Sequence, residues 1–503
     1  MIYDKQYYLD TFKVTKEQLD ALIATALGGG GTYADLFFEN TSSTDLMLRD
    51  GAVASGGFNV DYGVGVRTLL GEKTGYAYAE STDPAAMRAA ALSAAAIGAA
   101  GSRSVAGAAA RSKGEGALQP GPAAASIAGD DGYVPRLYRG QPNPAADRYP
   151  FLQNWNDRKP AELSRILYSL DEKLRSADKR VLKVMAVLSY QTSDILIYNS
   201  YEELKYETRP MGTVAVSAIL SDGKNVLNCH SSRSFRKGAE MITDSLTDEL
   251  CHDILRNIDD KFAAGRPKGG KMPVVMGAGA SGILLHEAMG HAFEADFIRK
   301  GQSIFEGRLG SKICNENITI VDDGTIKGNR GSINFDDEGV PAQRTVMVDK
   351  GVLTSFLHDR ISARALGVQP TGNGRRENFR CAPIPRMRAT YMESGPDSSA
   401  DIISSVKKGI YVDEFSNGQV KIGEGDFTFY VKSGYLIENG HLTAPVKDIN
   451  IIGNGPQALS DIVAVGCDAK IDDGAWTCGK EQSVPVSCGI PTVLVGGLTV
   501  GGE

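Results

Sequence analysis

The sequence lacks any long apolar run. Its longest weakly apolar stretch, residues 84–100, is mostly alanine and contains Arg88, so it is too short and too weakly hydrophobic to span a bilayer. The first twelve residues include acidic side chains and have no apolar core, which is not the pattern of a secretory signal peptide. We therefore expect a cytoplasmic protein that does not work at a membrane.

Excess positive charge and paired cysteines are also absent. Lysine and arginine together number 54 against 61 acidic residues, which gives a net charge of −7, so we expect no nucleic-acid partner. The seven cysteines are odd in number and scattered, a pattern that favours reduced thiols over a disulfide framework. A charged content of 23% and a hydrophobic content of 42% indicate an ordinary globular chain, which at this length predicts two to four domains.

Changes in composition divide the chain into four segments. We expect an N-terminal α+β domain over residues 1–100 and a Gly/Ala/Pro-rich linker or insertion over residues 101–160. A middle α+β domain is expected over residues 161–265, and a large domain with many glycine-punctuated strands over residues 272–503. The predicted fold class is therefore α+β, with two smaller α+β units followed by a large β-rich C-terminal domain.

Local signals predict several elements within these segments. Thr15 fits the N-cap of a helix over residues 16–27, and Asp83-Pro84 opens an alanine-rich helix. Between them, the apolar segments at 34–39 and 45–49 predict two separate short strands. A single helix over residues 239–262 is expected to close the middle domain.

Histidine is rare, but two of the six lie five residues apart in the segment His286-Glu287-Ala288-Met289-Gly290-His291. Imidazoles bind transition metals through a neutral ring nitrogen. A neighbouring carboxylate can accept a proton from a water bound to such a metal. The segment therefore predicts half of a hydrolytic metal site, which the C-terminal domain would carry on a helix.

The spacing of this motif requires an irregular helix. In an ideal α-helix, residues five apart point ~140° away from each other, so two imidazoles so placed could not share one ion. We therefore expect either a π-type insertion or a helix that ends near Gly290, with His291 folding back.

A catalytic zinc needs a third protein ligand and an open position. Glu294 and Asp296 are candidates near the histidines, and His358 and any of the cysteines are more distant ones. Cys478 lies beside a glycine in a predicted turn suited to presenting a ligand. Spacing alone does not choose among these residues.

Other motifs favour simpler interpretations. Residues 277–282 match G-x-G-x-x-G, but no strand ending in an acidic residue follows as a dinucleotide fold would require. A nucleotide-dependent oxidoreductase thus remains a minor alternative. The glycine-rich segment 372–376, with its two arginines, and the acidic segments 321–324 and 336–339 are interpreted as ordinary turns.

Several longer segments resemble the TldD/PmbA family, which is known as a metalloprotease family and has also carried the label of DNA gyrase modulator. The similar segments in the C-terminal unit are GAGASGILLHEAMGHAFEADF (277–297), VDDGT (321–325), DDEG (336–339), PTGNGRR (370–376), IPRM (384–387), TCGK (477–480) and LTVGG (498–502). GVGVR (63–67) and GEKTGYAYAE (71–80) are similar farther upstream. The HExxxH motif together with TCGK is similar to the TldD branch of the family.

The resemblance implies a function beyond what spacing shows. It implies that His286, His291 and Cys478 ligate the metal and that Glu287 is the general base in the hydrolysis of unfolded or extended peptides. Zinc is the implied metal, and iron would also suit such ligands. The implied assembly is a homodimer or a heterodimer with a TldE/PmbA-like subunit. The alternative is a non-catalytic regulatory or binding protein of the gyrase-modulator type, with a structural metal.

Overall fold

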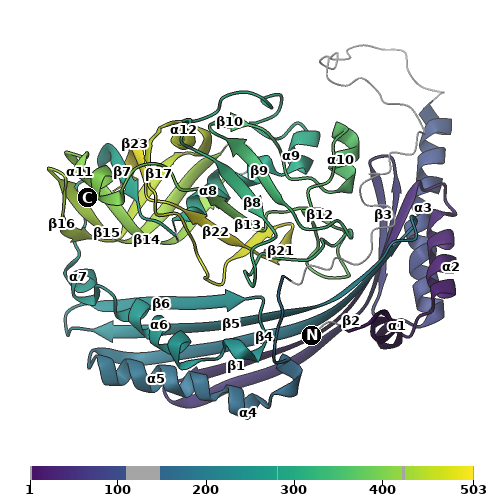
Figure 1. The fold of residues 1–503 in the computed structure, drawn as a ribbon, viewed down its shortest axis with the longest axis horizontal. Helices are drawn as coiled ribbons and strands as arrows, with labels where there is room; N and C mark the ends of the chain where they lie inside the picture. Colours follow the sequence, from purple (N-terminus) through teal and green to yellow (C-terminus); the bar gives the residue numbers. More distant parts are fainter. Residues whose placement is uncertain (1–2, 109–147, 280, 422–424, 502–503) are drawn as a thin grey trace.

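The computed structural model describes residues 3–108, 148–279, 281–421 and 425–501. It confirms the α+β class, with a large β-rich C-terminal region that includes a barrel. Figure 1 shows the C-terminal unit over one face of a long N-terminal sheet. Among the described residues, no helix is both long and apolar enough to cross a membrane.

The N-terminal sheet has six antiparallel strands in the order β3-β2-β1-β4-β5-β6. Their bounds are β1 Tyr33–Arg49, β2 Ala52–Leu70, β3 Lys73–Ala79, β4 Val181–Asn199, β5 Leu204–Ser221 and β6 Val226–Phe235. Because β1 pairs with β4 from Asp35↔Asn199 to Arg49↔Met185, the first and second predicted α+β units contribute to one continuous sheet.

Strand β1 corrects the prediction of two short strands. Polar residues 40–44 separate the two predicted strands, yet in the structure they continue β1 from one strand to the other. They pair with β2 on one side and β4 on the other, which satisfies their backbone groups without any apolar side chain. Strand pairing thus overrides local composition here.

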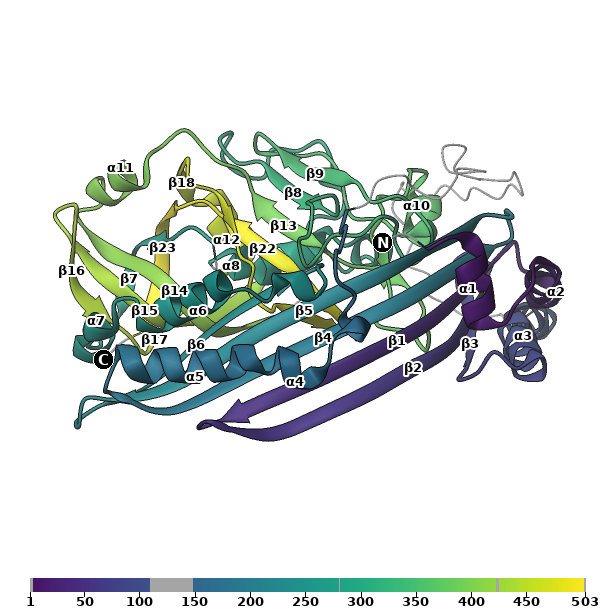
Figure 2. The ribbon, with the colours of Figure 1, turned by 60° about the horizontal axis from the view of Figure 1, so that its bottom comes forward.

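Helices cover one end and one face of this sheet (Figure 2). Helices α1 (Lys5–Phe12), α2 (Lys16–Leu27) and α3 (Pro84–Ala108) pack at the end that holds β3. Helices α4 (Pro160–Leu163), α5 (Arg165–Ala177), α6 (Asp244–Leu255) and α7 (Ile258–Ala263) belong to the second half, where α5 and α6 pack on β4 and β5.

The predicted linker over residues 101–160 differs from the structure at both ends. Helix α3 continues to Ala108, and residues 109–147 lie outside the described residues. Near the other end, Trp155 in the short 3₁₀ helix η1 (Trp155–Asp157) is fully buried. Its indole stacks on Tyr190 with 4.8 Å between ring centroids, so this part of the segment is packed against the sheet.

The single helix predicted over residues 239–262 is wrong. The chain forms η2 (Ala239–Met241), then α6, then α7. Thr243 caps the start of α6 by accepting a hydrogen bond from Leu246 N, and Asn257 has a left-handed φ of 52° between α6 and α7. The cap and the left-handed residue each interrupt a continuous helix.

The C-terminal unit contains a barrel. The sheet order is β14-β7-β23-β17-β15-β16, with β18 paired to β23, and the additional pairing of β14 with β15 closes the ring. The bounds are β7 Gly270–Met276, β14 Lys408–Val420, β15 Asp426–Glu438, β16 His441–Val446, β17 Ile449–Asn454, β18 Ile462–Val465 and β23 Val493–Gly501.

A second C-terminal sheet has the order β10-β9-β8-β13-β22-β19. Its strands are β8 Ile320–Asp323, β9 Arg344–Asp349, β10 Val352–Leu353, β13 Ala389–Met392, β19 Lys470–Ile471 and β22 Ser487–Ile490. Two hairpins are separate from both large C-terminal sheets. They are β11–β12 (Gly374–Arg375, Ile384–Pro385) and β20–β21 (Thr477–Lys480, Gln482–Pro485). The helices are α8 Gly282–Ala288, η3 Gly290–Phe293, α9 Ala295–Arg299, α10 Arg360–Leu366, α11 Ser399–Ser404 and α12 Gly455–Ser460.

The sheet meets the C-terminal unit across buried ion pairs, here called the interface charge layer and defined by Asp35, Arg67, Arg209, Asp337, Glu338 and Arg376. Arg67 Nη1 lies 2.6 Å from Glu338 Oε1, and its Nε donates to Asp35 Oδ2 over 2.8 Å. Arg209 Nη1 donates to Asp337 over 2.5 Å. The DDEG segment and the second arginine of the glycine-rich segment thus join the two parts of the protein.

Candidate metal centre

The helix that carries the HExxxH motif ends inside the motif. Helix α8 stops at Ala288, Met289 has φ −131° and ψ −39°, and the 3₁₀ helix η3 begins at Gly290. The predicted irregularity is therefore confirmed. A side chain at position 290 would overlap the sulfur of Met387, so the close approach of Met387 requires glycine at the break.

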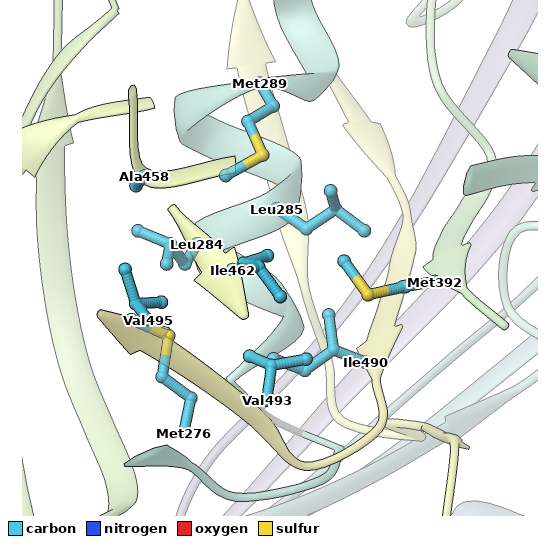
Figure 3. Close-up of a pocket in the computed structure, with 10 residues that line it drawn as sticks. All are labelled: Met276, Leu284, Leu285, Met289, Met392, Ala458, Ile462, Ile490, Val493 and Val495. Atoms are coloured by element: carbon cyan, nitrogen blue, oxygen red, sulfur yellow. The ribbon is translucent and has the colours of Figure 1, made fainter. Parts of the chain in front are cut away.

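Apolar packing fixes α8 against the barrel. Leu284, Leu285 and Met289 are buried in the main C-terminal core. Figure 3 shows them around a small apolar cavity that is also lined by Met276 from β7 and Ile490 from β22. Since the apolar face of α8 is anchored in this way, the opposite part of the helix end can present polar side chains.

The structure brings His286, His291 and Cys478 together. One ligand atom from each lies within 4.8 Å of the other two, and all three residues are buried. Cys478 Sγ is 3.3 Å from His291 Nε2, and the two imidazole rings have centroids 5.3 Å apart. Cys478 lies within strand β20 of the hairpin β20–β21, and not in a turn as predicted. It is far along the chain from the histidines, so sequence spacing could not have selected it.

These residues fit a metal ion. Both ring nitrogens of His286 are buried without a hydrogen-bond partner, a condition that is rare unless another group satisfies them. His291 donates from Nδ1 to Glu294 Oε2 over 2.8 Å, which leaves Nε2 facing the thiol. Two imidazoles and a thiolate form a donor set that suits zinc and iron.

The electrostatics favour a thiolate. Burial alone would raise the pKa of Cys478, but the neighbouring His286 and His291 outweigh it and lower the pKa to about 4. For His291, burial opposes the charged form, yet Glu294 and Cys478 raise the pKa to about 10. The pocket therefore stabilises a positive charge next to the thiolate, and a cation could take the place of the imidazolium proton.

Glu287 lies beside the two imidazoles and is more exposed than they are. Its carboxylate oxygens are 4.0 Å from His286 Nε2 and 3.9 Å from His291 Nε2. Its side chain keeps 31% of its exposure, whereas the imidazoles are almost fully buried. The carboxylate is thus placed beside the ligand group and still reaches solvent.

The other candidate ligands take different places. Glu294 and Asp296 lie behind His291, where both accept hydrogen bonds from Lys480 Nζ, at 3.0 Å and 2.7 Å. His358 is buried elsewhere, and burial lowers its pKa to about 4. Lys480 was missed in the sequence, although its position two residues after Cys478 was a usable signal, because alternate residues of a strand share a face.

Comparison with known proteins identifies the family of this chain. Residues 34–98 match the sequence model of the PmbA/TldA metallopeptidase domain 1, residues 153–261 match that of the central domain, and residues 269–502 match that of the C-terminal domain. A metalloprotease TldD homolog of Haemophilus influenzae is 37% identical over 482 residues, which cover 93% of each chain.

The chain belongs to the TldD/PmbA family of metallopeptidases. The resemblance inferred from its motifs is thereby confirmed, and so is its assignment as an enzyme. The metalloprotease names of the relatives indicate a metal cofactor.

Solved structures share the TldD/PmbA fold. A proposed modulator of a DNA gyrase from Thermotoga maritima superposes with a TM-score of 0.72 at 22% identity and covers 96% of this chain and 99% of its own. TldE from Thermococcus kodakarensis superposes with a TM-score of 0.70 at 18% identity and covers 96% of this chain and 100% of its own. At these identities, the likeness concerns the fold alone.

Proposed function

We propose that this chain is a metal-dependent peptidase that hydrolyses unfolded or extended peptides. His286, His291 and Cys478 hold the metal, with zinc as the preferred ion and iron as the alternative, and Glu287 is the general base. The observation that supports this most directly is the convergence of three buried donors beside one partly exposed carboxylate. Three donors leave a coordination position open for a reactant.

The residues divide the chemical work. A bound zinc would supply Lewis acidity, which polarises the scissile carbonyl and makes a water molecule acidic near neutral pH. Glu287 accepts the proton of the attacking water and delivers it to the leaving amine. Glu294 holds His291 through Nδ1, which keeps Nε2 directed at the metal position. Burial of the donors excludes competing water from the ligand side.

The test compares Glu287→Gln with the unchanged protein. Both are incubated with a mixture of unstructured peptides, cleavage is followed by mass spectrometry, and bound metal is measured by elemental analysis. We expect Glu287→Gln to retain its metal and to lose turnover by roughly 10²- to 10⁴-fold. Glu316→Gln, which alters an exposed carboxylate, is the matched control and should cleave normally. Unchanged cleavage by Glu287→Gln would refute the assignment of the base.

The third ligand is tested separately. Cys478→Ser should lose metal, because a neutral hydroxyl replaces a thiolate whose pKa lies far below neutrality. Full metal occupancy in this variant would exclude Cys478 as a ligand.

A regulatory protein with a structural metal is the second candidate. A structural zinc has four protein ligands, whereas the described residues bring only three donors together at this position. The donor count thus favours catalysis. A spectrum of the cobalt-loaded protein that shows four protein donors and does not respond to added substrate would favour the regulatory role.

We also propose that the chain acts as a dimer, either with itself or with a TldE/PmbA-like subunit. The fold that it shares with a protein named TldE supports a common mode of assembly. Sedimentation of the chain alone, and then with such a subunit, tests this proposal. A monomer under both conditions would contradict it.

A further inference from the structure

A buried ion cluster joins the two segments that carry the proposed metal ligands. We infer that Glu294 and Lys480 are positioning residues that set the place of Cys478 relative to His291. This inference rests on the proposed metal site. It concerns how the Cys478 thiolate and the His291 imidazole are placed next to each other. Neither positioning residue is itself a ligand.

Glu294 is the centre of the cluster. It is fully buried, and its Oε2 accepts from His291 Nδ1 over 2.8 Å and from Lys480 Nζ over 3.0 Å. Its Oε1 accepts from the backbone N–H of Met387 over 3.2 Å and lies 3.8 Å from Arg386 Nε. The carboxylate of Glu294 therefore contacts His291, which is one proposed ligand. It also contacts Lys480, which lies two positions after Cys478, another proposed ligand.

Lys480 ties the strand of Cys478 to this carboxylate. Both residues lie on β20, two positions apart, so their side chains emerge on the same face of the strand. Lys480 Nζ also donates to Asp296 over 2.7 Å and to the Pro385 carbonyl over 3.3 Å, and it lies 4.3 Å from the centroid of the Phe297 ring. Its ammonium is thus held by several groups of the His291 segment and its surroundings.

The hairpin β20–β21 depends on such side chains. Its strands pair only with each other in the described part of the chain. Arg386 instead donates to three of its carbonyls, at Cys478, Lys480 and Gln482, over 2.6–3.0 Å. Arg386 also faces Glu294. The hairpin is therefore linked to the carboxylate of Glu294 twice, by its backbone through Arg386 and by the side chain of Lys480.

This arrangement selects the register of the hairpin. A one-residue slip of a strand moves every side chain to its other face. Such a slip would withdraw Cys478 from His291 and would also move Lys480 to the exposed face of the strand, away from Glu294 and Asp296. The two buried carboxylates would then lose this cation. Loss of one partner of a buried ion pair is strongly unfavourable, so the ion cluster penalises any register that removes the thiolate from the metal position.

The experiment measures cobalt binding in the full-length protein. Cobalt is used in place of zinc at the proposed metal site. Its thiolate-to-cobalt charge-transfer band reports whether Cys478 is bound to the ion. Lys480→Met, Glu294→Gln and the double variant are compared. We expect each single variant to bind cobalt about 10- to 100-fold more weakly, with a weaker charge-transfer band. The double variant should be little worse than either, because both changes remove the same link.

Lys261→Met is the matched control. Lys261 is a buried lysine whose Nζ lies 3.2 Å from Glu414 on a different part of the molecule. This variant should lower the unfolding midpoint and leave cobalt affinity and the band unchanged. The unfolding midpoints of all variants distinguish a positioning effect from a general loss of stability. If Lys480→Met does not fold, Glu294→Gln provides the test, because it preserves the shape of the side chain.

The outcomes are distinguishable. Cobalt affinity and band intensity within twofold of the unchanged protein, in folded Lys480→Met or Glu294→Gln, would overturn the positioning role and leave the metal site intact. Absence of a thiolate band in the unchanged protein would instead overturn the proposed ligand set, and the positioning role with it. Strictly additive losses in the double variant would show that the two residues act separately.

Discussion

Two buried charge networks in this protein can be compared directly. In the interface charge layer, carboxylates of one unit meet guanidinium groups of the other, and Arg67 and Glu338 are both completely buried. In the cluster behind His291, Glu294 and Lys480 are equally buried, but the chain of contacts ends at an imidazole that faces a thiol. Dense buried charge alone therefore does not mark a reactive centre.

The distinguishing feature is the kind of group that each network brings together. In the interface charge layer, every member has an opposite charge within ion-pair distance. At the candidate metal centre, two imidazoles and a thiol converge instead. Paired opposite charges hold the fold together, whereas two imidazoles beside a thiol form a donor set that suits a transition metal.

Breaking the interface charge layer should have the largest effect on stability. Arg67→Met leaves Asp35 and Glu338 buried without their main cation, and we expect the free energy of unfolding to fall by about 3–5 kcal/mol. Metal affinity of the folded fraction should stay unchanged. Denaturant unfolding and metal competition measure the two quantities.

A surface ion pair provides the control for this change. Lys16 and Asp20 are each about half exposed, so Lys16→Met should alter the free energy of unfolding by less than about 1 kcal/mol. Equal losses in the two variants would show that burial does not determine the strength of the interface charge layer.

Glu39 is a buried carboxyl beside the interface charge layer, and unlike the carboxylates of that layer it has no ion-pair partner among the described residues. It accepts from Phe379 N and Thr41 Oγ1, both over 2.8 Å, and no cation of the described residues forms an ion pair with it. Burial raises its pKa from 4.5 to about 7. The folded state then retains a proton that the unfolded state has lost, so stability falls as pH rises from about 4.5 to about 7.

Glu39→Gln should remove this fall. Between pH 4.5 and pH 8, the free energy of unfolding of the variant should rise by up to about 3 kcal/mol relative to that of the unchanged protein. The reason is that one pKa unit corresponds to about 1.4 kcal/mol. Unfolding curves at several pH values test the prediction. Parallel pH profiles for the two proteins would exclude Glu39 as the titrating group.

The sequence predicted local features better than long-range ones. The helix break at Gly290 and the capped helix α2 followed from residues a few positions apart. The pairing of β1 with β4 could not be predicted, because the strands are separated by more than a hundred residues of unrelated composition. The ion pair between Arg67 and Glu338 of the DDEG segment likewise joins residues that are far apart in the chain.

The candidate site divides in the same way. His286, Glu287 and His291 were visible as one short motif, whereas residue patterns alone left several choices for the third donor, and only the family resemblance singled out Cys478. The structure brings Cys478 to His291 through a hairpin held by arginine side chains. Contacts of that kind have no periodic signal in a sequence.

Gly290→Ala tests the helix break at the metal centre. The added methyl group would overlap the sulfur of Met387, so we expect overpacking of about 1–3 kcal/mol and weaker metal binding, since η3 carries His291. Gly496→Ala is the control, because its new methyl group would meet only atoms 3.5 Å away or farther. Unchanged metal affinity in Gly290→Ala would show that the break tolerates a side chain.

A small effect is also expected at Thr15, which is remote from both networks. Its side chain accepts from Gln18 N, and Gln18 Oε1 accepts from Thr15 N over 2.9 Å. Thr15→Ala should lower the free energy of unfolding by about 1 kcal/mol through loss of this cap, with no change in metal affinity or in the pH profile. If cobalt affinity fell here as well, metal binding would follow global stability. The ion cluster behind His291 would then have no specific role, and the contrast between the two networks would reduce to position in the fold.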